Sequence, residues 1–407
     1  MRICGVVSEY NPLHSGHVFH WKEIRRRLGA DCAIVCCMSG DFVQRGEGAL
    51  LPKHSRARAA VEAGADLVVE NPAPYALQSA EGFAGGGVRI LSGLGVLTHL
   101  SFGAEDADEG WLRETASILL EHDTVAATLV QLKTGVSYAA ARERALFARM
   151  QERAALVQKP NNILAVEYCK AVLRQGLALE LVPVARQGAA HDGAPAANHA
   201  SASWLRQQLR QGSADAALPY LPASSAAALT RALEEGTALL SPERLECAML
   251  SRLIRLEPEE LALLPDAAEG LEHRLHQAIH TGRTLEEIAL QAKTKRYALS
   301  RIRRMLLCAY LGITAEDAAV PAPYIRVLAM NERGQEVLRL ARKRASLPLL
   351  TKPAHIRRLS PEAQRCFALE ALACDLYQLA LPGWQRFSVG DDWRQDAIRL
   401  SPPAEAE

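Results

Sequence analysis

Two histidines that flank a Ser-Gly pair are the first residues whose types and spacing suggest chemistry. The tetrapeptide HSGH (14–17) follows a short apolar run and precedes residues with helical periodicity. Unpaired N–H groups at a helix start carry partial positive charge and attract phosphate. Imidazoles placed there can donate hydrogen bonds to phosphate oxygens, and Gly16 has no Cβ to keep a nucleotide from the backbone. The segment predicts a nucleotide phosphate site, with an ordinary pair of helix-capping histidines as the alternative.

A second candidate lies in "SASWLRQQL" (201–209), which supplies Ser201, Ser203 and Arg206. Two hydroxyls at a helix start and an arginine one turn later can hold the charged tail of a triphosphate. An ordinary N-cap with a solvated arginine explains this segment equally well when it is taken alone. Its position after HSGH and a series of strands favours the phosphate interpretation.

The elements that must position these residues alternate between short apolar runs and helical stretches up to about residue 190. Continuous Val-, Ile-, Leu- and Cys-rich runs are typical of parallel strands covered on both faces. Strands are expected at 2–7, 32–38, 65–70, 96–102 and 179–185, and helices at 17–28, 53–64, 77–92, 110–121, 139–155 and 162–176. The alternation predicts an α/β fold with a doubly wound, five-stranded parallel sheet, in which ligands lie beyond the carboxyl ends of the strands.

The strand signal fades after a Gly-, Ala- and His-rich loop at 186–203. Helices are expected at 203–212, 221–236, 241–255, 257–264, 267–281, 284–292, 294–311, 331–345 and 360–381. We therefore expect two domains, an α/β domain over 1–205 and a mostly α-helical C-terminal domain over 206–400. The Pro- and acid-rich tail 401–407 is expected to be frayed.

Composition narrows the class of protein. The chain has 407 residues, of which 49% are apolar and only 5% aromatic, so Ala, Leu and Val must fill its cores. The apolar run at the N-terminus is too short for a signal peptide, and no apolar stretch approaches the roughly 20 residues of a membrane span. Nine scattered cysteines with no C-x-x-C pair favour reduced thiols. These features predict a cytoplasmic protein that does not bind a membrane.

The net charge of +1 conceals an uneven distribution along the chain. Residues 291–358 hold 15 Lys and Arg against 4 Asp and Glu, whereas the remainder has an excess of acid. Such an asymmetry indicates an anionic partner for the basic segment, although single basic residues commonly just solvate exposed helices. The residues expected to contact such a partner are Lys293, Lys295, Arg296, Arg303 and Arg304. On a helix, positions 296, 300, 303 and 304 share one face, and Ile302, Met305 and Leu306 can pack inward.

HSGH resembles the signature of the H-x-G-H nucleotidyltransferase superfamily in both composition and context. Five ordered segments sharpen that match: "SEYNPLHSGHVFH" (8–20), "MSGDFVQRGE" (38–47), "LSFGAE" (100–105), "KPNNILAVEY" (159–168) and "TKRYALSRIRRML" (294–306). Together they resemble the bacterial tRNA(Met) cytidine acetate ligase family. The resemblance is dense in the N-terminal half and extends to the basic helix of the C-terminal half.

The resemblance implies a two-step reaction on ATP, acetate and elongator tRNA(Met). Acetate and ATP would give acetyl-adenylate and pyrophosphate, and the acetyl group would pass to N4 of the wobble cytidine. His14, His17 and Arg206 are the implied catalytic residues. The implied ATP contacts are Val7, Ser8, Glu9, Tyr10, Asn11, Pro12, Leu13, His14, Ser15, Gly16, His17, Val18, Phe19, His20, Gly103, Asn162, Arg186, Ser201 and Ser203. The N-terminal domain would then be the ATP-binding catalytic domain, and the C-terminal domain would bind tRNA.

Some positions stay open. Leu13 and Ser15 stand where the family commonly has Phe and Asn, so an aromatic contact to the nucleotide is in question. Gln44 and Arg45 can contact substrate or order their loop. Mg²⁺ can accompany ATP, but no paired carboxylates mark a protein metal site.

Two other functions use the same motifs. A small-molecule adenylyltransferase would need both phosphate-binding segments but not a basic, helical second half. A tRNA-binding protein with a non-catalytic nucleotide-sensing domain would not require intact His14, His17 and Arg206, since binding alone tolerates their loss.

Overall fold

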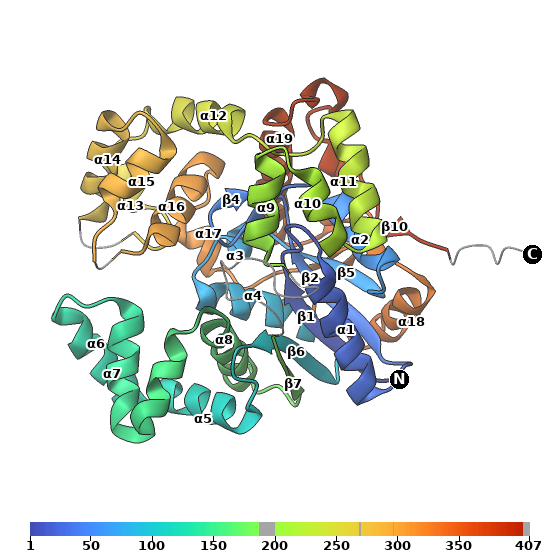
Figure 1. The fold of residues 1–407 in the computed structure, drawn as a ribbon, viewed down its shortest axis with the longest axis horizontal. Helices are drawn as coiled ribbons and strands as arrows, with labels where there is room; N and C mark the ends of the chain where they lie inside the picture. Colours follow the sequence, from blue (N-terminus) through green and yellow to red (C-terminus); the bar gives the residue numbers. More distant parts are fainter. Residues whose placement is uncertain (187–199, 268–269, 296, 402–407) are drawn as a thin grey trace, which may run out of the picture.

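A parallel sheet forms the centre of the fold in the computed structural model, which describes residues 1–186, 200–267, 270–295 and 297–401 (Figure 1). Its five parallel strands are β1 (Ile3–Ser8), β2 (Ala33–Ser39), β5 (Leu67–Asn71), β6 (His99–Ala104) and β7 (Glu180–Ala185). They lie in the order β5-β2-β1-β6-β7. The chain thus leaves β1 first toward β2 and β5, and later toward β6 and β7. This reversal confirms the doubly wound fold and opens a crevice at the carboxyl ends of β1 and β6.

Helices cover both faces of the sheet because side chains alternate along each strand. Cys4 and Val6 of β1 face α1 (Ser15–Leu28) and α2 (Lys53–Glu62). On the opposite face, Ile3 and its neighbours pack against three other helices. These are α4 (Ala80–Ser92), α5 (Glu109–Leu120) and α8 (Pro160–Arg174).

Further elements of this half were not predicted as separate units. A two-stranded antiparallel hairpin, β3 (Phe42–Val43) and β4 (Glu47–Gly48), follows β2. The short helix α3 (Ala73–Ala76) precedes α4, and α6 (His122–Lys133) pairs with α7 (Tyr138–Met150). The helix expected at 139–155 ends earlier and continues as the 3₁₀ segment Gln151–Gln158.

The second half is mainly helical, as the sequence indicates. Its helices are α9 (Ala202–Arg210), α10 (Ala214–Ala217), α11 (Ala223–Glu235), α12 (Glu243–Leu253), α13 (Pro258–Ala262), α14 (Leu271–Thr281), α15 (Leu285–Ala292), α16 (Leu299–Leu311), α17 (Ala315–Ala319), α18 (Glu332–Ala341) and α19 (Pro361–Leu379). Helices α12 to α16 share one apolar core with α19 and stand beside the sheet (Figure 1). No helix among the described residues is both long and apolar enough to cross a membrane.

The C-terminal half also returns to the sheet, which the sequence analysis did not anticipate. Strand β8 (Ile325–Met330) pairs antiparallel with β5, and β9 (Leu349–Leu350) and β10 (Ile398–Arg399) pair with β8. The strand "IRVLAM" is short, contains the charged Arg326, and is rich in residues that also suit helices. Its strand character depends on pairing with β5 rather than on its own pattern.

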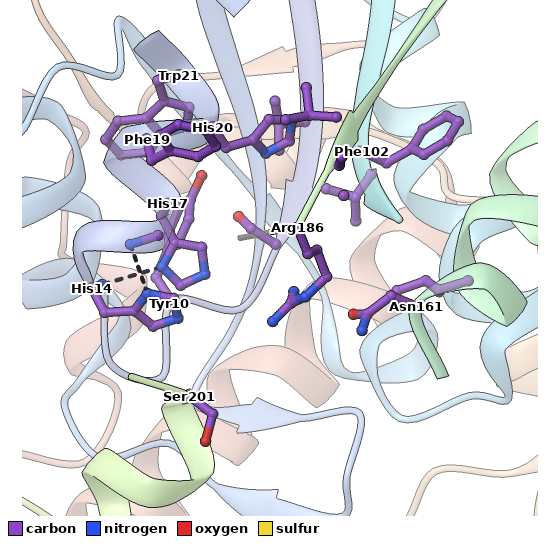
Figure 2. Close-up of a pocket in the computed structure, with 18 of the residues that line it drawn as sticks. Tyr10, His14, His17, Phe19, His20, Trp21, Phe102, Asn161, Arg186 and Ser201 are labelled. Atoms are coloured by element: carbon purple, nitrogen blue, oxygen red, sulfur yellow. Dashed lines mark hydrogen bonds between the residues drawn. The ribbon is translucent and has the colours of Figure 1, made fainter. Parts of the chain in front are cut away.

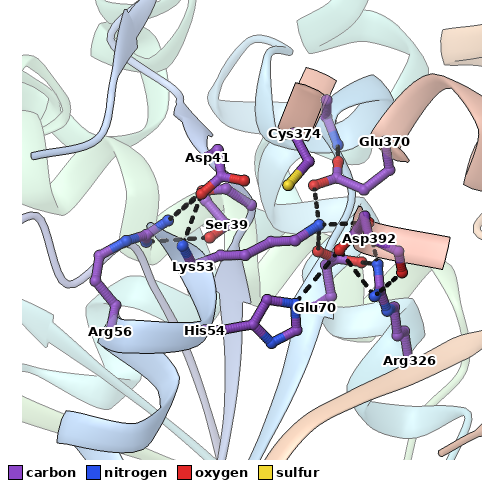
Figure 3. Close-up of polar contacts among 12 residues, drawn as sticks. Ser39, Asp41, Lys53, His54, Arg56, Glu70, Arg326, Glu370, Cys374 and Asp392 are labelled. Atoms are coloured by element: carbon purple, nitrogen blue, oxygen red, sulfur yellow. Dashed lines mark hydrogen bonds and ion pairs between the residues drawn. The ribbon is translucent and has the colours of Figure 1, made fainter. Parts of the chain in front are cut away.

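A buried ionic cluster joins the two halves beside this strand (Figure 3). Lys53 Nζ of α2 lies 2.7 Å from Glu70, 2.9 Å from Glu370 and 2.9 Å from Asp392. Arg326 of β8 contacts Glu70 and Asp392. All five side chains are almost completely buried. The cluster therefore ties α2 and β5 to β8, α19 and the segment near residue 392.

Candidate active site

A cavity of about 180 Å³ opens at the carboxyl ends of β1, β6 and β7, against the start of α1 (Figure 2). This is the crevice at which the direction of the chain through the sheet reverses. Predicted site residues that line it are Val7, Ser8, Tyr10, His14, Gly16, His17, Phe19, His20, Gly103, Arg186 and Ser201. The structure thus brings the HSGH turn and the ends of β6 and β7 around one space.

The two signature histidines cap their own helix. His14 is the N-cap of α1, and its Nδ1 accepts a hydrogen bond from the Gly16 N–H at 3.1 Å. The Nδ1 of His17 accepts from the His14 N–H, also at 3.1 Å, and the two ring centroids are 3.9 Å apart. A nitrogen that accepts a hydrogen bond carries no proton, so each neutral ring is protonated at Nε2. The capping interpretation and the phosphate-site interpretation therefore use different nitrogens of the same rings.

Electrostatics keep two imidazoles of this cavity, those of His17 and His20, neutral. Burial, together with His14 and Arg186, holds the pKa of His17 well below its usual value. Burial and Arg186 also lower the pKa of His20, to about 4. Ser101 Oγ donates to the Val182 carbonyl, so the 2.7 Å contact from His20 Nε2 is donated by the imidazole. The site consequently offers imidazole N–H donors at neutral pH, without adding imidazolium charge.

Only part of the loop between β1 and α1 lines the cavity. Other side chains of the loop make contacts within the protein that fix its conformation. Tyr10 has φ of +48°, a left-handed conformation uncommon outside glycine, and its hydroxyl donates to Cys36 Sγ at 3.0 Å. Asn11 Oδ1 accepts from the Leu50 N–H at 2.7 Å. Predicted contacts that do not line the cavity are Glu9, Asn11, Pro12, Leu13, Ser15 and Val18. Leu13 is buried in the core against α1, where an aliphatic side chain can pack.

Arg186 supplies the cationic side chain of the cavity. It follows β7, and a Cβ at Gly103 would lie 3.4 Å from the Arg186 Cγ, so the glycine leaves room for the arginine chain. Burial lowers the pKa of Arg186, and Glu105 opposes that shift. With a usual pKa above 12, the guanidinium remains charged. It can therefore pair with an anionic group in the cavity.

The two asparagines at the start of α8, Asn161 and Asn162, have different surroundings. Asn161 lines the cavity, whereas Asn162 is completely buried. Asn162 accepts from the Asp106 N–H at 3.0 Å and donates to Asp106 Oδ2 at 2.8 Å. Asn162 therefore holds the end of β6 against α8 by hydrogen bonds, and the Asn161 side chain lies on the cavity wall.

The second predicted phosphate segment forms the start of α9. Ser201 is its N-cap, accepts from the Trp204 N–H at 3.2 Å, and lines the cavity. Ser203 accepts from Arg45 at 3.2 Å and lies outside it. Arg206 is buried, donates to the Asn11 carbonyl at 2.8 Å, and lies 2.9 Å from Glu47. The structure thus brings Ser201, but neither Ser203 nor Arg206, to the cavity wall.

Several lining residues were not singled out as nucleotide contacts from the sequence. They are Val6, Trp21, Phe102, Asn161, Leu164, Tyr168, Val184, Ala185 and Ala200. The Phe102 and Tyr168 rings stack with centroids 5.5 Å apart, and Tyr10 contacts Trp21 edge-on at 5.6 Å. Spacing gave a signal for some of them, because Trp21 lies one turn after His17. These aromatic residues supply the aromatic surface that Leu13 does not provide.

Glu105, directly after β6, and Asp41, two residues after β2, are carboxylates that could accompany Mg²⁺ but already have hydrogen-bond partners in the protein. Glu105 accepts from the N–H groups of Asn161 and Asn162 at 3.1 and 2.8 Å, so it caps α8. Asp41 is buried and accepts from the Lys53 N–H at 2.6 Å. Within the described ranges, no group of three or more His, Cys, Asp or Glu side chains is placed to hold a metal ion.

A second and larger cavity, of about 1000 Å³, lies between α7, α8 and the basic helix α16. The predicted RNA contacts Lys293, Lys295, Arg303 and Arg304 all line it, and Arg296 lies outside the described residues. Ile302, Met305 and Leu306 are buried as expected, although α16 begins at Leu299 rather than near 294. Gln44 and Arg45 from the β3–β4 hairpin also line this cavity. The hairpin residues Gln44 and Arg45 also contact Glu9 and Ser203, respectively, so the hairpin connects this groove to the β1–α1 loop and to the start of α9.

The fold and the capped HSGH turn define a nucleotidyltransferase, and a family model described as HIGH nucleotidyl transferase matches residues 1–390. Proteins named tRNA(Met) cytidine acetate ligase are similar over almost the whole chain. The one from Acetivibrio thermocellus is 33% identical over 98% of this chain and 100% of its own. The one from Thermoanaerobacter sp. is 34% identical over 93% of this chain and 96% of its own.

Solved structures of Thermotoga maritima TmcAL are also similar. The apo form superposes with a TM-score of 0.93 at 30% identity, covering 99% of this chain and 100% of that chain. A form bound with alpha-thio ATP superposes with a TM-score of 0.91 at the same identity and coverage. The chain belongs to the tRNA(Met) cytidine acetate ligase family, and as a member of that family it is an enzyme, a ligase.

Proposed function

We propose that this enzyme activates acetate with ATP and transfers the acetyl group to N4 of the wobble cytidine in elongator tRNA(Met). The observation that carries the proposal is the pair of Nε2-protonated imidazoles beside the cavity at the start of α1. N–H donors, a helix N-terminus and the Arg186 guanidinium together form a binding site for phosphate. The names of the relatives and the alpha-thio ATP bound to one of them support ATP and tRNA as substrates.

The first step forms acetyl-adenylate. A carboxylate oxygen of acetate attacks the α-phosphorus of ATP, the bond from that phosphorus to the bridging oxygen breaks, and pyrophosphate leaves. Because acetate is itself the nucleophile, the protein needs to hold the reactants in line and to stabilise the negative charge that develops. We assign His14, His17 and Arg186 to the phosphate oxygens, since all three line one cavity.

The departing pyrophosphate is assigned to the start of α9. Ser201 lies at that helix start on the cavity wall, and Arg206 lies one turn later. Arg206 contacts Glu47 at 2.9 Å, so it must exchange this carboxylate for phosphate if it is to bind the leaving group. Arg186 needs no such exchange, which makes it the first guanidinium that ATP meets.

The second step transfers the acetyl group. The exocyclic amine of cytidine attacks the acyl carbon, the bond to the adenylate oxygen breaks, AMP leaves, and the amine loses one proton. The base must leave the anticodon stack to reach the cavity, as bases do in other modifying enzymes. The basic groove beside α16 supports this step, because phosphate contacts hold an RNA without reading its sequence.

A direct test uses the complete protein with ATP, labelled acetate and an elongator tRNA(Met) transcript. The proposal expects label in the RNA, together with pyrophosphate and AMP, and no label when a transcript with another wobble base replaces it. Pyrophosphate release that requires a phosphorylated metabolite instead of acetate would favour a small-molecule adenylyltransferase. ATP binding without any turnover would favour a nucleotide-sensing, RNA-binding protein. Either of these outcomes overturns the proposal.

A further inference from the structure

The basic segment of the sequence is divided by the fold into two separate surfaces. Helix α16, which carries the first group of basic residues, stands with α14 and α15 on one side of the sheet. Helix α18, which carries the second, lies on the far side of the sheet in Figure 1. The two groups of basic residues therefore lie at different places on the molecule (Figure 1). The second group needs an explanation of its own.

This second group, here called the α18 cation patch, contains five arginines and two lysines. No Asp or Glu occurs between residues 337 and 361. Every member is exposed, and within the described residues none forms an ion pair with a carboxylate. The members are Arg339, Arg342, Lys343, Arg344, Lys352, Arg357 and Arg358.

The backbone beneath the patch is fixed. The Ser346 N–H donates to the Gly93 carbonyl at 2.9 Å, and the Ile325 N–H donates to the Pro348 carbonyl at 2.9 Å. Leu350 and Ile356 are buried in the core of the sheet. The cations are thus held on a rigid support, which reduces the conformational entropy lost when they bind an anion.

Like charges on this helix end oppose folding slightly. Arg339 lies in the last turn of α18, and Arg342 and Lys343 follow its last residue, Ala341, so like charges crowd the end of the helix. The helix dipole offsets part of this cost, because cations are favoured near a C-terminus. It does not explain Arg357 and Arg358, which lie in a separate 3₁₀ segment.

Several arginines of the N-terminal half, by contrast, are paired with carboxylates. Arg113 lies 2.7 Å from Glu109, Arg149 lies 2.8 Å from Glu121, and Arg153 lies 2.8 Å from Asp108. An unpaired, acid-free surface on a rigid support is suited to an external polyanion. The arginine fork in particular suits phosphate oxygens.

We propose that the α18 cation patch binds backbone phosphates of the tRNA outside its anticodon arm. The inference rests on the proposed function, which supplies the RNA, and extends it by assigning a second RNA-binding surface. Exposed basic residues with few large apolar neighbours fit an RNA backbone better than they fit a membrane, which would also require inserted apolar side chains. Leu340 is the only large exposed apolar side chain from residue 337 to residue 361, at 43% exposure.

The test compares two RNAs on two matched variants of the complete protein. The patch variant carries Arg339→Gln, Arg342→Gln and Lys343→Gln, and the control carries Arg113→Gln, Arg149→Gln and Arg153→Gln. Affinity is measured over a salt series for a full-length elongator tRNA(Met) transcript and for its isolated anticodon stem–loop. The three patch positions and two of the three control positions are exposed, and Arg113 is only half-buried, so both variants are expected to fold.

The patch variant is expected to bind full-length tRNA about ten- to hundredfold more weakly near physiological salt, with a log–log salt slope shallower by about two to three. Its affinity for the stem–loop and its acetate-dependent pyrophosphate release stay unchanged, and the control retains full affinity. Equal losses for both RNAs, no loss for either, or an equal loss in the control would overturn the inference. The inference would also be overturned if the patch variant kept its affinity for RNA but lost binding to phosphatidylserine vesicles. That result would show that the patch binds a membrane.

Failure of this inference can be distinguished from failure of the proposed function. A wild-type protein that binds the full-length tRNA through the patch but transfers no acetyl group contradicts the proposed reaction alone. A protein that acetylates the tRNA equally well and binds it equally tightly without the patch contradicts only the second surface.

Discussion

The backbone of α1 selects the tautomer of the two imidazoles at the active site. Because the Gly16 and His14 N–H groups occupy Nδ1 of His14 and His17, respectively, the proton of each neutral ring is on Nε2. A protonated ring would lose its capping bond as well as its neutrality. Helix capping and the presentation of N–H donors to a phosphate are therefore coupled, and substitution of either histidine affects both.

Replacing His17 by alanine is expected to reduce acetate-dependent ATP cleavage by about a hundredfold or more, because a preorganised donor to the developing charge is lost. Affinity for tRNA should stay within about twofold, since the basic groove is untouched. His122→Ala is the matched control, because that side chain is almost fully exposed on α6. Pyrophosphate release and RNA binding are measured on the same preparations. Parallel loss of both in His17→Ala would count against the assignment.

The low pKa of His17 predicts how activity and stability respond to pH. Since burial keeps this ring neutral, kcat/KM for ATP should show no inflection from His17 between pH 8 and pH 6. In the unfolded chain the ring takes up a proton near pH 6.5. The unfolded state then binds more protons, so the free energy of unfolding decreases as the pH falls below about 6.5.

A His17→Gln variant lacks this contribution. Urea denaturation of wild type and variant at pH 8, 6.5 and 5 should show the wild type losing more stability at the acidic end. A difference between the two proteins that is independent of pH would mean that the ring titrates normally and is not held neutral.

At the level of elements, the β3–β4 hairpin joins the nucleotide cavity to the basic groove. Gly46 has φ of +79°, and a Cβ there would lie 2.7 Å from the Arg303 carbonyl carbon and from the Arg304 nitrogen. The turn therefore packs directly on the backbone of α16. Arg45 beside it contacts Ser203 and also lines the groove. Movement of this hairpin would change both sites together.

Gly46→Ala should separate α16 from the hairpin and lower the rate of tRNA acetylation at least tenfold, with a smaller effect on acetyl-adenylate formation. The reason is that a new methyl group meets backbone, which cannot move aside without displacing the helix. Gly212→Ala is the control, since Gly212 has a similar φ of +77° but open space around its Cβ position. It reports the conformational cost alone, about 1 kcal/mol.

Both steps can be measured separately, by pyrophosphate release without RNA and by label transfer to tRNA. Equal effects of Gly46→Ala and Gly212→Ala on label transfer would show that close packing at the hairpin has no role.

The sequence was sufficient to predict the parallel strands and the position of the HSGH turn at the start of a helix, because both leave local patterns. Apolar runs specify buried strands, and HSGH carries its own capping bonds. Strand β8 left no such pattern, since its pairing with β5 and the burial of Arg326 against Asp392 depend on distant residues.

The sequence also could not predict which of two similar polar residues faces the cavity. Asn161 and Asn162 are both polar residues at a helix start, and only packing against Asp106 decides which of them is buried. Likewise, Arg186 faces the cavity and Arg206 faces Glu47 because of where their elements end. Side-chain direction at element ends depends on tertiary partners, which local spacing does not encode.

At the scale of the whole molecule, the cavity beside the histidines and the basic groove are formed by different sets of elements. The first cavity lies at the start of α1, whereas the basic groove is lined by α7, α8 and the hairpin residues Gln44 and Arg45 as well as by α16 and the residues before it. The Arg303 side chain pairs with Glu286, and Arg304 lies 3.5 Å from Asp266. These acids orient the guanidinium groups, and an RNA phosphate competes with them for the same donors.

Replacing both Arg303 and Arg304 by glutamine should weaken binding of full-length tRNA and of the anticodon stem–loop by about five- to thirtyfold, because two phosphate contacts are removed. Acetate-dependent ATP cleavage should be spared. The control replaces both by lysine, which keeps the charge and should recover much of the affinity. Loss of ATP cleavage in the glutamine variant, or unchanged affinity for the stem–loop, would place the RNA elsewhere.

The buried cluster around Lys53 couples the two halves and has an excess of negative charge. Lys53 and Arg326 face three carboxylates, those of Glu70, Glu370 and Asp392 (Figure 3). Burial disfavours the charged form of Asp392, but Lys53 and Arg326 outweigh it and hold its pKa well below the usual value. For Glu370 burial prevails over the attraction of Lys53 and raises the pKa to about 8. The excess charge is therefore relieved at Glu370.

This assignment predicts a specific dependence of stability on pH. An unfolded glutamate loses its proton near pH 4.3. Between that pH and about 8 the folded state binds more protons than the unfolded state at this residue, so its contribution to the free energy of unfolding falls as the pH rises and levels off above about 8. In Glu370→Gln the titrating group is gone. The stability of the variant relative to wild type should therefore increase from pH 5 to pH 8.

Urea denaturation at pH 5, 6.5 and 8 measures the difference, with Glu234→Gln on the exposed face of α11 as the control whose difference from wild type stays constant. A constant difference for Glu370→Gln would mean that Glu370 is ionised throughout this range. All three carboxylates would then be charged against two cations, and the fold would have to tolerate an uncompensated buried charge.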